Sequence, residues 1–204
     1  MKIICVGRNY SEHIAELNNE RAKDPVLFLK PETAILLKKQ PFFIPDFSEN
    51  VHHEIEVCVR INRLGKNIAP QFARKYYSEV TVGLDFTARD LQSQLKEKGL
   101  PWEKAKAFDG SAAIGKWVSL ESVGGDINNL NFSLEKDGET AQSGNTSQMI
   151  TPIDELISYI STFFTLKIGD VIFTGTPAGV SQIQAGNQLK GFLEGEQLLN
   201  ISVK

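Results

Sequence analysis

The sequence is poor in cysteine, contains no basic run and has no long apolar run, and each absence excludes a class of protein. Only two cysteines occur among 204 residues, outside any C-x-x-C or Cys/His cluster, so neither a disulfide scaffold nor a zinc site is indicated. A formal net charge of −3 without basic clusters argues against nucleic-acid binding. No apolar run approaches the length that spans a membrane, so a membrane partner is not expected.

The composition that remains is typical of a soluble globular protein. Hydrophobic residues make up 41% of the chain, which is long enough to bury a core. The first apolar run, residues 3–6, is too short for the core of a signal peptide. Cys5 and Cys58 lie in apolar, strand-like runs, as buried free thiols of a reducing compartment do. We therefore expect one domain, residues 1–204, of a cytoplasmic protein.

Residues 51–61 have the clearest strand pattern in the chain. Apolar and polar residues alternate from Val51 to Ile61, which predicts one half-buried strand. Glu54 and Glu56 are two residues apart and therefore project from the same face. Two carboxylates about 5 Å apart repel by roughly 3 kcal/mol at an effective dielectric constant of about 20, and a divalent cation would reverse that repulsion. Taken alone, the stretch is explained more simply by two solvated surface glutamates.

Asp85 ends another alternating run, at residues 80–85, just before a predicted helix. With Glu54 and Glu56 it could complete a set of three carboxylates, and oxygen ligands without histidine favour Mg²⁺ or Mn²⁺. Two alternatives stay open. Asp85 could cap the turn that follows it, and His52, on the same strand face as the glutamates, could belong to a histidine–carboxylate iron site.

Two pairs of polar residues have helical spacing. His13 and Glu16 are three apart on a short predicted helix, where the carboxylate would raise the basicity of the imidazole, as a general base requires. Arg89 and Gln92 have the same spacing on the helix predicted after Asp85, and the arginine could bind a carboxylate through two hydrogen bonds. For both pairs, taken alone, a solvated helix face is the simpler explanation.

Three further polar residues are weaker candidates. Lys30 lies on a strand predicted at residues 25–31, where its ammonium could reach solvent past apolar neighbours. Lys106 lies in a loop-like segment, residues 101–116, and by itself indicates a surface lysine. Thr176 lies in the turn at residues 174–179, which could direct N–H groups and a hydroxyl at an anion but lacks the lysine of a phosphate-binding loop.

Strands outnumber helices, and the two do not alternate in βαβ fashion, so a mostly β domain with a few helices is predicted. Ser11 is the expected N-cap of the first helix, and Thr87 with Asp90 has the spacing of a capping box before the second. Thr151 followed by Pro152 marks the clearest helix start, and an apolar stripe continues from there to residue 164.

Taken together, the motifs resemble the fumarylacetoacetate hydrolase family. The matching segments, in chain order, are VGRNY at 6–10, SEHIAE at 11–16, LFLKP at 27–31, HHEIEV at 52–57, LDFTARDLQ at 84–92, GLPWEKAKAFDG at 99–110, QSGNTSQMI at 142–150 and GDVIFTGTPAGV at 169–180. Their order and spacing cover nearly the whole chain. The resemblance is strongest to the short single-domain branch that contains acylpyruvases and oxaloacetate decarboxylases.

The resemblance implies a fold and a site. The fold is a mixed β-roll like the C-terminal domain of the family, mostly β (α+β) with a few peripheral helices, and usually a homodimer. One Mg²⁺ or Mn²⁺ per chain would be held by Glu54, Glu56 and Asp85. The residues implied in catalysis are His13, Glu16 and Lys106. Those implied in substrate binding are Arg89, Gln92, Thr176 and Lys30. His13 and Glu16 would lie on a mobile lid, residues 8–24.

The resemblance also implies a reaction, the metal-dependent hydrolysis of a C–C bond in short 2,4-dioxo acids such as acetylpyruvate or fumarylpyruvate. His13, oriented by Glu16, would deprotonate a water that attacks the 4-oxo carbon. Cleavage of the C3–C4 bond would leave a pyruvate enolate, stabilised by the metal and Lys106.

Three alternatives remain open. Oxaloacetate gives the same enolate on losing CO₂, so the protein could be an oxaloacetate decarboxylase or a keto–enol tautomerase. Neither reaction needs an attacking water, so we expect His13→Ala to abolish hydrolysis and spare them. A related 2-oxo acid hydratase or isomerase is a further alternative. A non-enzymatic metabolite-binding protein is the last, and it would leave His13 turned permanently away from the carboxylates.

Overall fold

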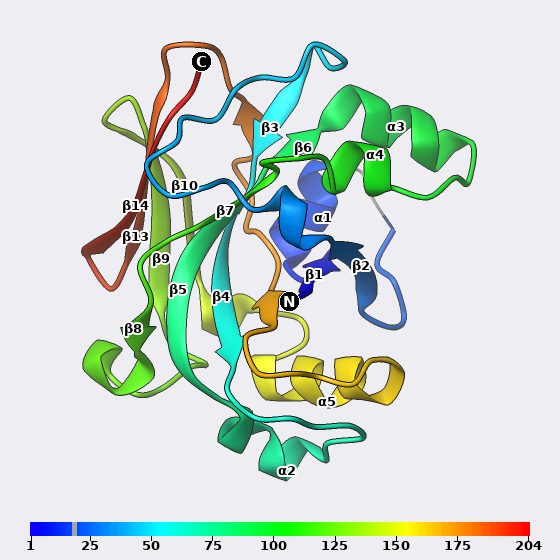
Figure 1. Ribbon diagram of the computed structural model, residues 1–204, viewed down its shortest axis with the longest axis vertical. Helices are drawn as coiled ribbons and strands as arrows, with labels where there is room; N and C mark the ends of the chain where they lie inside the picture. Colours follow the sequence, from blue (N-terminus) through cyan, green and yellow to red (C-terminus); the bar gives the residue numbers. More distant parts are fainter. Residues whose placement is uncertain (18–19) are drawn as a thin grey trace.

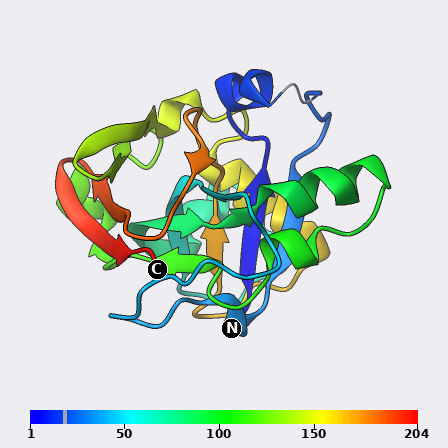
Figure 2. The same ribbon diagram turned by 90° about the horizontal axis from the view of Figure 1, so that it is seen from above.

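The computed structural model describes residues 1–17 and 20–204, and in them a long mixed sheet packs against a second, antiparallel sheet (Figures 1 and 2). The first sheet has the order β2 (Val26–Lys30), β1 (Ile3–Gly7), β11 (Val171–Phe173), β4 (Ile55–Ile61), β5 (Tyr77–Asp85) and β7 (Ala112–Ile114), with β8 (Val118–Ser119) also beside β5. Only β1 and β11 pair in parallel among these strands. The predicted mostly β class is confirmed.

The second sheet and a small third sheet complete the β structure. The second has the order β10 (Glu139–Asn145), β9 (Asn131–Lys136), β13 (Gln188–Leu193) and β14 (Glu196–Ser202). The third has the order β12 (Ser181–Gln182), β3 (Val51–His53) and β6 (Thr87–Ala88). One apolar core lies between the two larger sheets, where Val57 and Val59 of β4 join Leu134 and Leu189. Burial of each such side chain contributes about 1.5–3 kcal/mol to folding.

Residues 51–61 form two strands rather than the single half-buried strand that is predicted. β3 ends at His53 and β4 begins at Ile55, and the two strands belong to different sheets. Glu54, Glu56 and Cys58 of the polar face are also buried, whereas Arg60 at its end stays partly exposed. Cys58 on that face packs with Cys5 and Phe173, and both thiols are free and buried, as expected.

The helices lie around the first sheet. They are α1 (Ser11–Glu16), α2 (Pro70–Ala73), α3 (Arg89–Glu97), α4 (Glu103–Lys106) and α5 (Ile153–Phe163). Figure 1 shows α3 and α4 side by side, with α5 beside α2 at the far end of the molecule. The segment at 101–116, predicted as a loop, contains both α4 and β7. Within the described part of the chain, no helix is long and apolar enough to cross a membrane.

The predicted helix caps are wrong, although the helices themselves form. Tyr10 rather than Ser11 flanks α1, and no side chain caps it. Thr87 lies in β6, where its hydroxyl accepts a hydrogen bond from Lys106, so it is not available to cap α3. Pro152 rather than Thr151 flanks α5, which begins at Ile153. The predicted apolar stripe is buried within the helix, but Phe164 lies just beyond its end and is partly exposed. The predicted lid, residues 8–24, includes residues 18–19, which lie outside the described residues.

Candidate active site

Three buried carboxylates meet where β3, β4 and β5 come together. Glu54 lies at the break between β3 and β4, Glu56 on β4, and Asp85 at the end of β5. They are 4%, 2% and 0% exposed, and each offers an oxygen within 4.8 Å of the others. The N–H of Asp85 donates to the carbonyl of Glu54 at 2.9 Å, which ties the two segments together. The structure thus brings the three predicted carboxylates into one cluster.

Glu56 is the carboxylate with the least compensating positive charge. Its Oε2 accepts a hydrogen bond from the N–H of Gly175 at 2.6 Å. Burial, together with the negative charges of Asp85 and Glu54, raises the pKa of Glu56 well above its ordinary value. Gly175 has φ +107°, and a Cβ there would lie 2.7 Å from the Cβ of Asn9, so only glycine fits this approach. This carboxyl group therefore binds a proton or a cation more readily than an exposed glutamate does.

Lys106 is buried between two of the carboxylates. Its Nζ lies 2.5 Å from Glu54 Oε2 and 2.8 Å from Asp85 Oδ2, and donates to Thr87 Oγ1 at 2.6 Å. Burial favours the neutral amine, but Asp85 and Glu54 outweigh it and raise the pKa of Lys106 above its ordinary value. The side chain is therefore an ammonium. The prediction of a surface lysine from its loop-like segment is wrong, because α4 turns the side chain inward.

Lys30 approaches the cluster from β2 and does not reach solvent, so the interpretation of an exposed ammonium is wrong. Its Nζ lies 2.8 Å from Asp85 Oδ1 and donates to Ser111 Oγ at 3.0 Å and to the carbonyl of Lys106. The contact with Asp85 is an ion pair without hydrogen-bond alignment, so Asp85 Oδ1 accepts no hydrogen bond within the described residues.

The donor set fits a hard divalent cation. It consists of three carboxylates, and one of their buried oxygens, Asp85 Oδ1, has no hydrogen-bond donor in the described structure. The Lys106 ammonium lies between two of these carboxylates and supplies positive charge there. His52 is not in the cluster, because its Nε2 pairs with Asn50 Oδ1 at 2.9 Å. The histidine–carboxylate alternative therefore gains no support from the geometry.

His13 and Glu16 form a pair that faces the cluster. His13 is buried in the pocket wall, with Nδ1 3.2 Å from Glu16 Oε2. Glu16 Oε1 in turn accepts the N–H of Gly179 at 3.0 Å, which fastens α1 to the loop after β11. Burial lowers the pKa of His13 and outweighs the opposing effects of Glu54 and Glu16. The imidazole is therefore neutral at pH 7, with Nδ1–H directed at Glu16 and a lone pair on Nε2.

The first turn of α3 directs Arg89 and Gln92 inward, not to solvent. The N–H of Arg89 donates to the carbonyl of Asn50 at 2.8 Å, which sets this turn against β3. Its guanidinium pairs with Glu54 and donates to Gln92 Oε1 at 2.6 Å. Arg89 and Lys106 hold the pKa of Glu54 well below its ordinary value, although burial alone would raise it.

Thr176 is held in the pocket wall by a residue that the sequence reasoning did not single out, Gln142 of β10. The amide Nε2 of Gln142 donates to Thr176 Oγ1 at 2.9 Å, and its Oε1 accepts the N–H of Ile55 at 3.1 Å. His53 Nδ1 lies 2.8 Å from the same Oε1. Burial lowers the pKa of His53 to about 4, and because an amide oxygen only accepts, the neutral ring donates from Nδ1 to Gln142. The amide therefore joins the Thr176 loop to β4.

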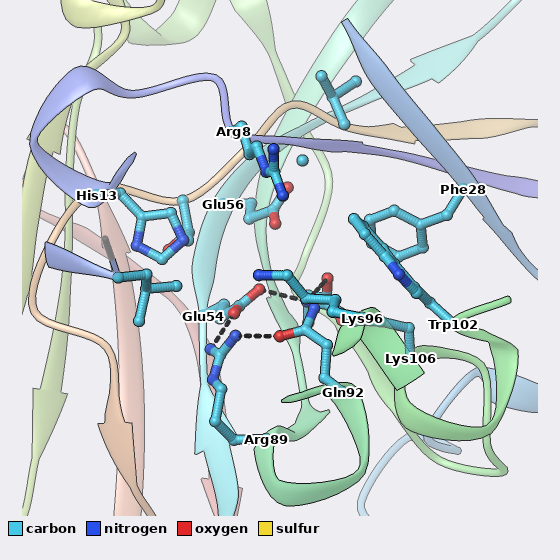
Figure 3. Close-up of a pocket in the computed structure, with 15 residues that line it drawn as sticks. Arg8, His13, Phe28, Glu54, Glu56, Arg89, Gln92, Lys96, Trp102 and Lys106 are labelled. Atoms are coloured by element: carbon cyan, nitrogen blue, oxygen red, sulfur yellow. Dashed lines mark hydrogen bonds and ion pairs between the residues drawn. The ribbon is translucent and has the colours of Figure 1, made fainter. Parts of the chain in front are cut away.

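Figure 3 shows the pocket that these side chains surround. Every predicted site residue lines it, except Glu16, which contacts His13, and Lys30, which contacts Asp85. The lining residues that sequence reasoning missed include Arg8, Leu17, Phe28, Lys96 and Trp102. Lys96 could have been found by continuing the helical spacing of Arg89 and Gln92 by one turn. The aromatic residues carry no comparable signal.

Comparison with known proteins gives consistent matches over the full length. The profile of a family described as fumarylacetoacetate (FAA) hydrolase C-terminal matches residues 2–201. The chain is 44% identical over 197 residues to oxaloacetate tautomerase YcgM of Escherichia coli (strain K12), covering 97% of this chain and 90% of that protein. It is 42% identical over 190 residues to a mitochondrial oxaloacetate decarboxylase of Dictyostelium discoideum, covering 93% and 87%.

A solved structure agrees with these matches. The crystal structure of fumarylpyruvate hydrolase from Pseudomonas aeruginosa in complex with Mn²⁺ and pyruvate superposes with a TM-score of 0.93. The two sequences are 36% identical, and the alignment covers 100% of this chain and 89% of that one.

Proposed function

The chain belongs to the fumarylacetoacetate hydrolase family of enzymes, and from this premise we propose that it is a divalent-metal-dependent oxaloacetate tautomerase. One observation carries the proposal: a neutral imidazole, His13, and a protonated amine, Lys106, line the same pocket as three clustered carboxylates. Keto–enol exchange needs a base at carbon, an acid at oxygen and stabilisation of the charge between them. The relative from E. coli bears the name of this activity.

The order of the two main hypotheses is therefore reversed. The sequence favours acylpyruvate hydrolysis, with oxaloacetate chemistry as the alternative. Two of the compared relatives are named for reactions of oxaloacetate, which supports that alternative. The position of His13 in the pocket wall argues against a protein that only binds a metabolite, since binding alone needs no base. A homodimer and a cytoplasmic location stay predictions.

Glu54, Glu56 and Asp85 would hold one Mg²⁺ or Mn²⁺, and the Mn²⁺ and pyruvate of the fumarylpyruvate hydrolase support this assignment. Bound there, the ion would polarise the 2-oxo group and offset the negative charge that develops on it. Lys106 Nζ donates to Glu54 and Asp85, and an ion that shared these carboxylates would leave an N–H of Lys106 available to the substrate.

The protein groups then exchange one proton for another. His13 Nε2 accepts a proton from C3 of oxaloacetate, the C–H electron pair becomes the C2–C3 double bond, and the 2-oxo oxygen becomes negative. Lys106 donates a proton to that oxygen, which yields the enol. A proton passes from His13 to Lys106 through solvent to restore both groups. Arg89 and Thr176 bind carboxylate oxygens of the substrate and orient C3 toward His13.

The experiment follows enol-oxaloacetate by its ultraviolet absorbance in the presence of Mg²⁺ or Mn²⁺, with metal alone as the reference. We expect the protein to accelerate loss of the enol, and chelation of the metal to abolish the acceleration. A rate equal to that of the metal alone would contradict the proposal.

Acylpyruvate hydrolysis is the second candidate, and the anchoring of Glu16 to Gly179 favours it. That contact fixes a neutral imidazole over the pocket, as activation of a water requires. Release of pyruvate from acetylpyruvate or fumarylpyruvate separates this activity from tautomerisation, which releases none. Release of pyruvate from oxaloacetate identifies decarboxylation.

A further inference from the structure

Two cationic side chains line the pocket beyond the groups used so far. Arg8 follows β1, and Lys96 lies in the last turn of α3. Figure 3 shows both side chains among those that border the space in front of Glu54 and Glu56. The two residues are far apart in the sequence, so it is the fold that brings them to one pocket.

Arg8 is held in its place by an unusual backbone conformation. Its φ is +61°, in the left-handed region that side chains other than glycine adopt at a cost of about 1 kcal/mol or more. Its guanidinium donates to the carbonyl of Glu20 at 3.1 Å, and no carboxylate pairs with it in the described parts of the chain. This is the one hydrogen bond of its guanidinium among residues 1–17 and 20–204, and a guanidinium has five N–H donors with which it can bind an anion.

Lys96 lies in a field of positive charge. Burial lowers its pKa, and Arg8, Arg89 and Lys106 lower it further, while Glu54 opposes them. All four side chains line the same pocket, where their like charges repel one another. An anion placed among them would relieve that repulsion.

The carboxylates of the cluster do not serve as that anion, because each already has partners. The contacts are Glu54 with Arg89 and Lys106, Asp85 with Lys30 and Lys106, and Glu56 with the N–H of Gly175. A divalent cation at the cluster would add further positive charge to the pocket. Apolar walls, including Phe28 and Trp102 with ring centroids 6.2 Å apart, reduce screening by water and strengthen attraction for an anion.

We infer that Arg8 and Lys96 form a second anion subsite, which binds the substrate carboxylate farther from the acidic cluster. This inference rests on the proposed function, because it places the 2-oxo end of the substrate at the cluster. The subsite makes the enzyme selective for 2-oxo acids with two carboxylates. Oxaloacetate has the second carboxylate, whereas pyruvate and the 4-ethyl ester of oxaloacetate lack its charge.

Binding and turnover are tested with matched ligands. Mg²⁺-loaded protein is titrated with 3,3-difluorooxaloacetate, which has no C3 proton and cannot tautomerise, and with pyruvate. Tautomerisation of oxaloacetate is compared with that of its 4-ethyl ester. The variants are Arg8→Gln and Lys96→Gln, with Lys98→Gln, an exposed residue just after α3, as the control.

We expect Arg8→Gln and Lys96→Gln each to weaken binding of difluorooxaloacetate about tenfold and to leave pyruvate binding within about twofold. The same variants should raise KM for oxaloacetate with little change for the ester, and Lys98→Gln should change neither. The inference would be wrong if the variants weakened binding of difluorooxaloacetate and pyruvate equally, and raised KM equally for oxaloacetate and its ester. Lys96→Gln keeps the test decisive if Arg8→Gln does not fold.

The experiments can refute the proposed function and the anion subsite independently of each other. If the wild-type protein binds difluorooxaloacetate through Arg8 and Lys96 but does not accelerate tautomerisation, the proposed function is wrong and the subsite stands. If tautomerisation is accelerated equally for oxaloacetate and the ester in all variants, the subsite is wrong and the function stands.

Discussion

The Nζ atom of Lys106 lies 2.8 Å from Oδ2 of Asp85, so a buried ammonium supplies charge within the cluster proposed to bind the metal ion. Removing this charge leaves Asp85 and Glu54 with less compensation in a buried setting. Breaking a buried ion pair from one side costs about 3–5 kcal/mol. The stability of the protein should therefore depend on Lys106 and on the metal together.

Lys106→Met tests this dependence. We expect it to lower the melting temperature of the metal-free protein and to increase the stabilisation that added Mg²⁺ gives, because the ion replaces the lost charge. Thermal melts with and without Mg²⁺ measure both effects, with the exposed Lys104→Met on the same short helix as control. If Mg²⁺ raised the melting temperatures of wild type and Lys106→Met equally, the claim that the ion replaces the charge of Lys106 would be wrong.

Replacement of His13 tests its role as the base. On sequence alone, tautomerisation needs no attacking water and is expected to survive His13→Ala. The buried neutral imidazole in the pocket wall changes that expectation, since it is placed to accept the C3 proton. We now expect His13→Ala to slow tautomerisation by about a hundredfold or more. The control is Glu12→Gln, an exposed residue on the same helix. Full activity of His13→Ala would show that His13 is not the base.

The pH dependence of the reaction follows from the lowered pKa of His13. A lower pKa means that the neutral base persists to more acidic solutions. The acidic limb of kcat/KM should therefore lie below the ordinary histidine value of about 6.5. Glu16 raises the pKa of His13, so Glu16→Gln should move the limb further toward acid. The profiles are measured at saturating metal, and a shift toward alkali in Glu16→Gln would be inconsistent with this assignment.

Gln142 is expected to position Thr176 without touching the substrate. Gln142→Leu removes the donor to Thr176 Oγ1 and the acceptor of the Ile55 N–H. A buried polar group left without a partner costs about 1–3 kcal/mol, so urea denaturation should show a loss of that size. We also expect KM to rise more than kcat falls, with partial recovery in Gln142→Glu. An unchanged KM in a folded Gln142→Leu variant would show that the contact is structural only.

Local spacing was enough to predict the parts of the site that lie within one element or repeat a fixed interval. Glu54 and Glu56 are two apart, and His13 and Glu16 are three apart, so each pair stays together in the structure. Spacing does not reveal that the chain changes sheets at Glu54, because that break depends on pairing with β12 and β6.

Burial of charge was the main feature that spacing could not predict. Lys30 and Lys106 come from segments that indicate exposure, yet both are drawn inward by Asp85, which lies far from them in sequence. Arg8 escapes prediction for a similar reason, since its left-handed backbone conformation follows no residue preference.

Calorimetric titration of metal-stripped protein with Mn²⁺ tests the central claim most directly, namely that Glu54, Glu56 and Asp85 hold one divalent cation. We predict saturable binding of one ion per chain, with affinity reduced at least about a hundredfold in a folded Asp85→Asn variant. Absence of saturable binding in the wild type, or unchanged affinity in Asp85→Asn, would contradict the account.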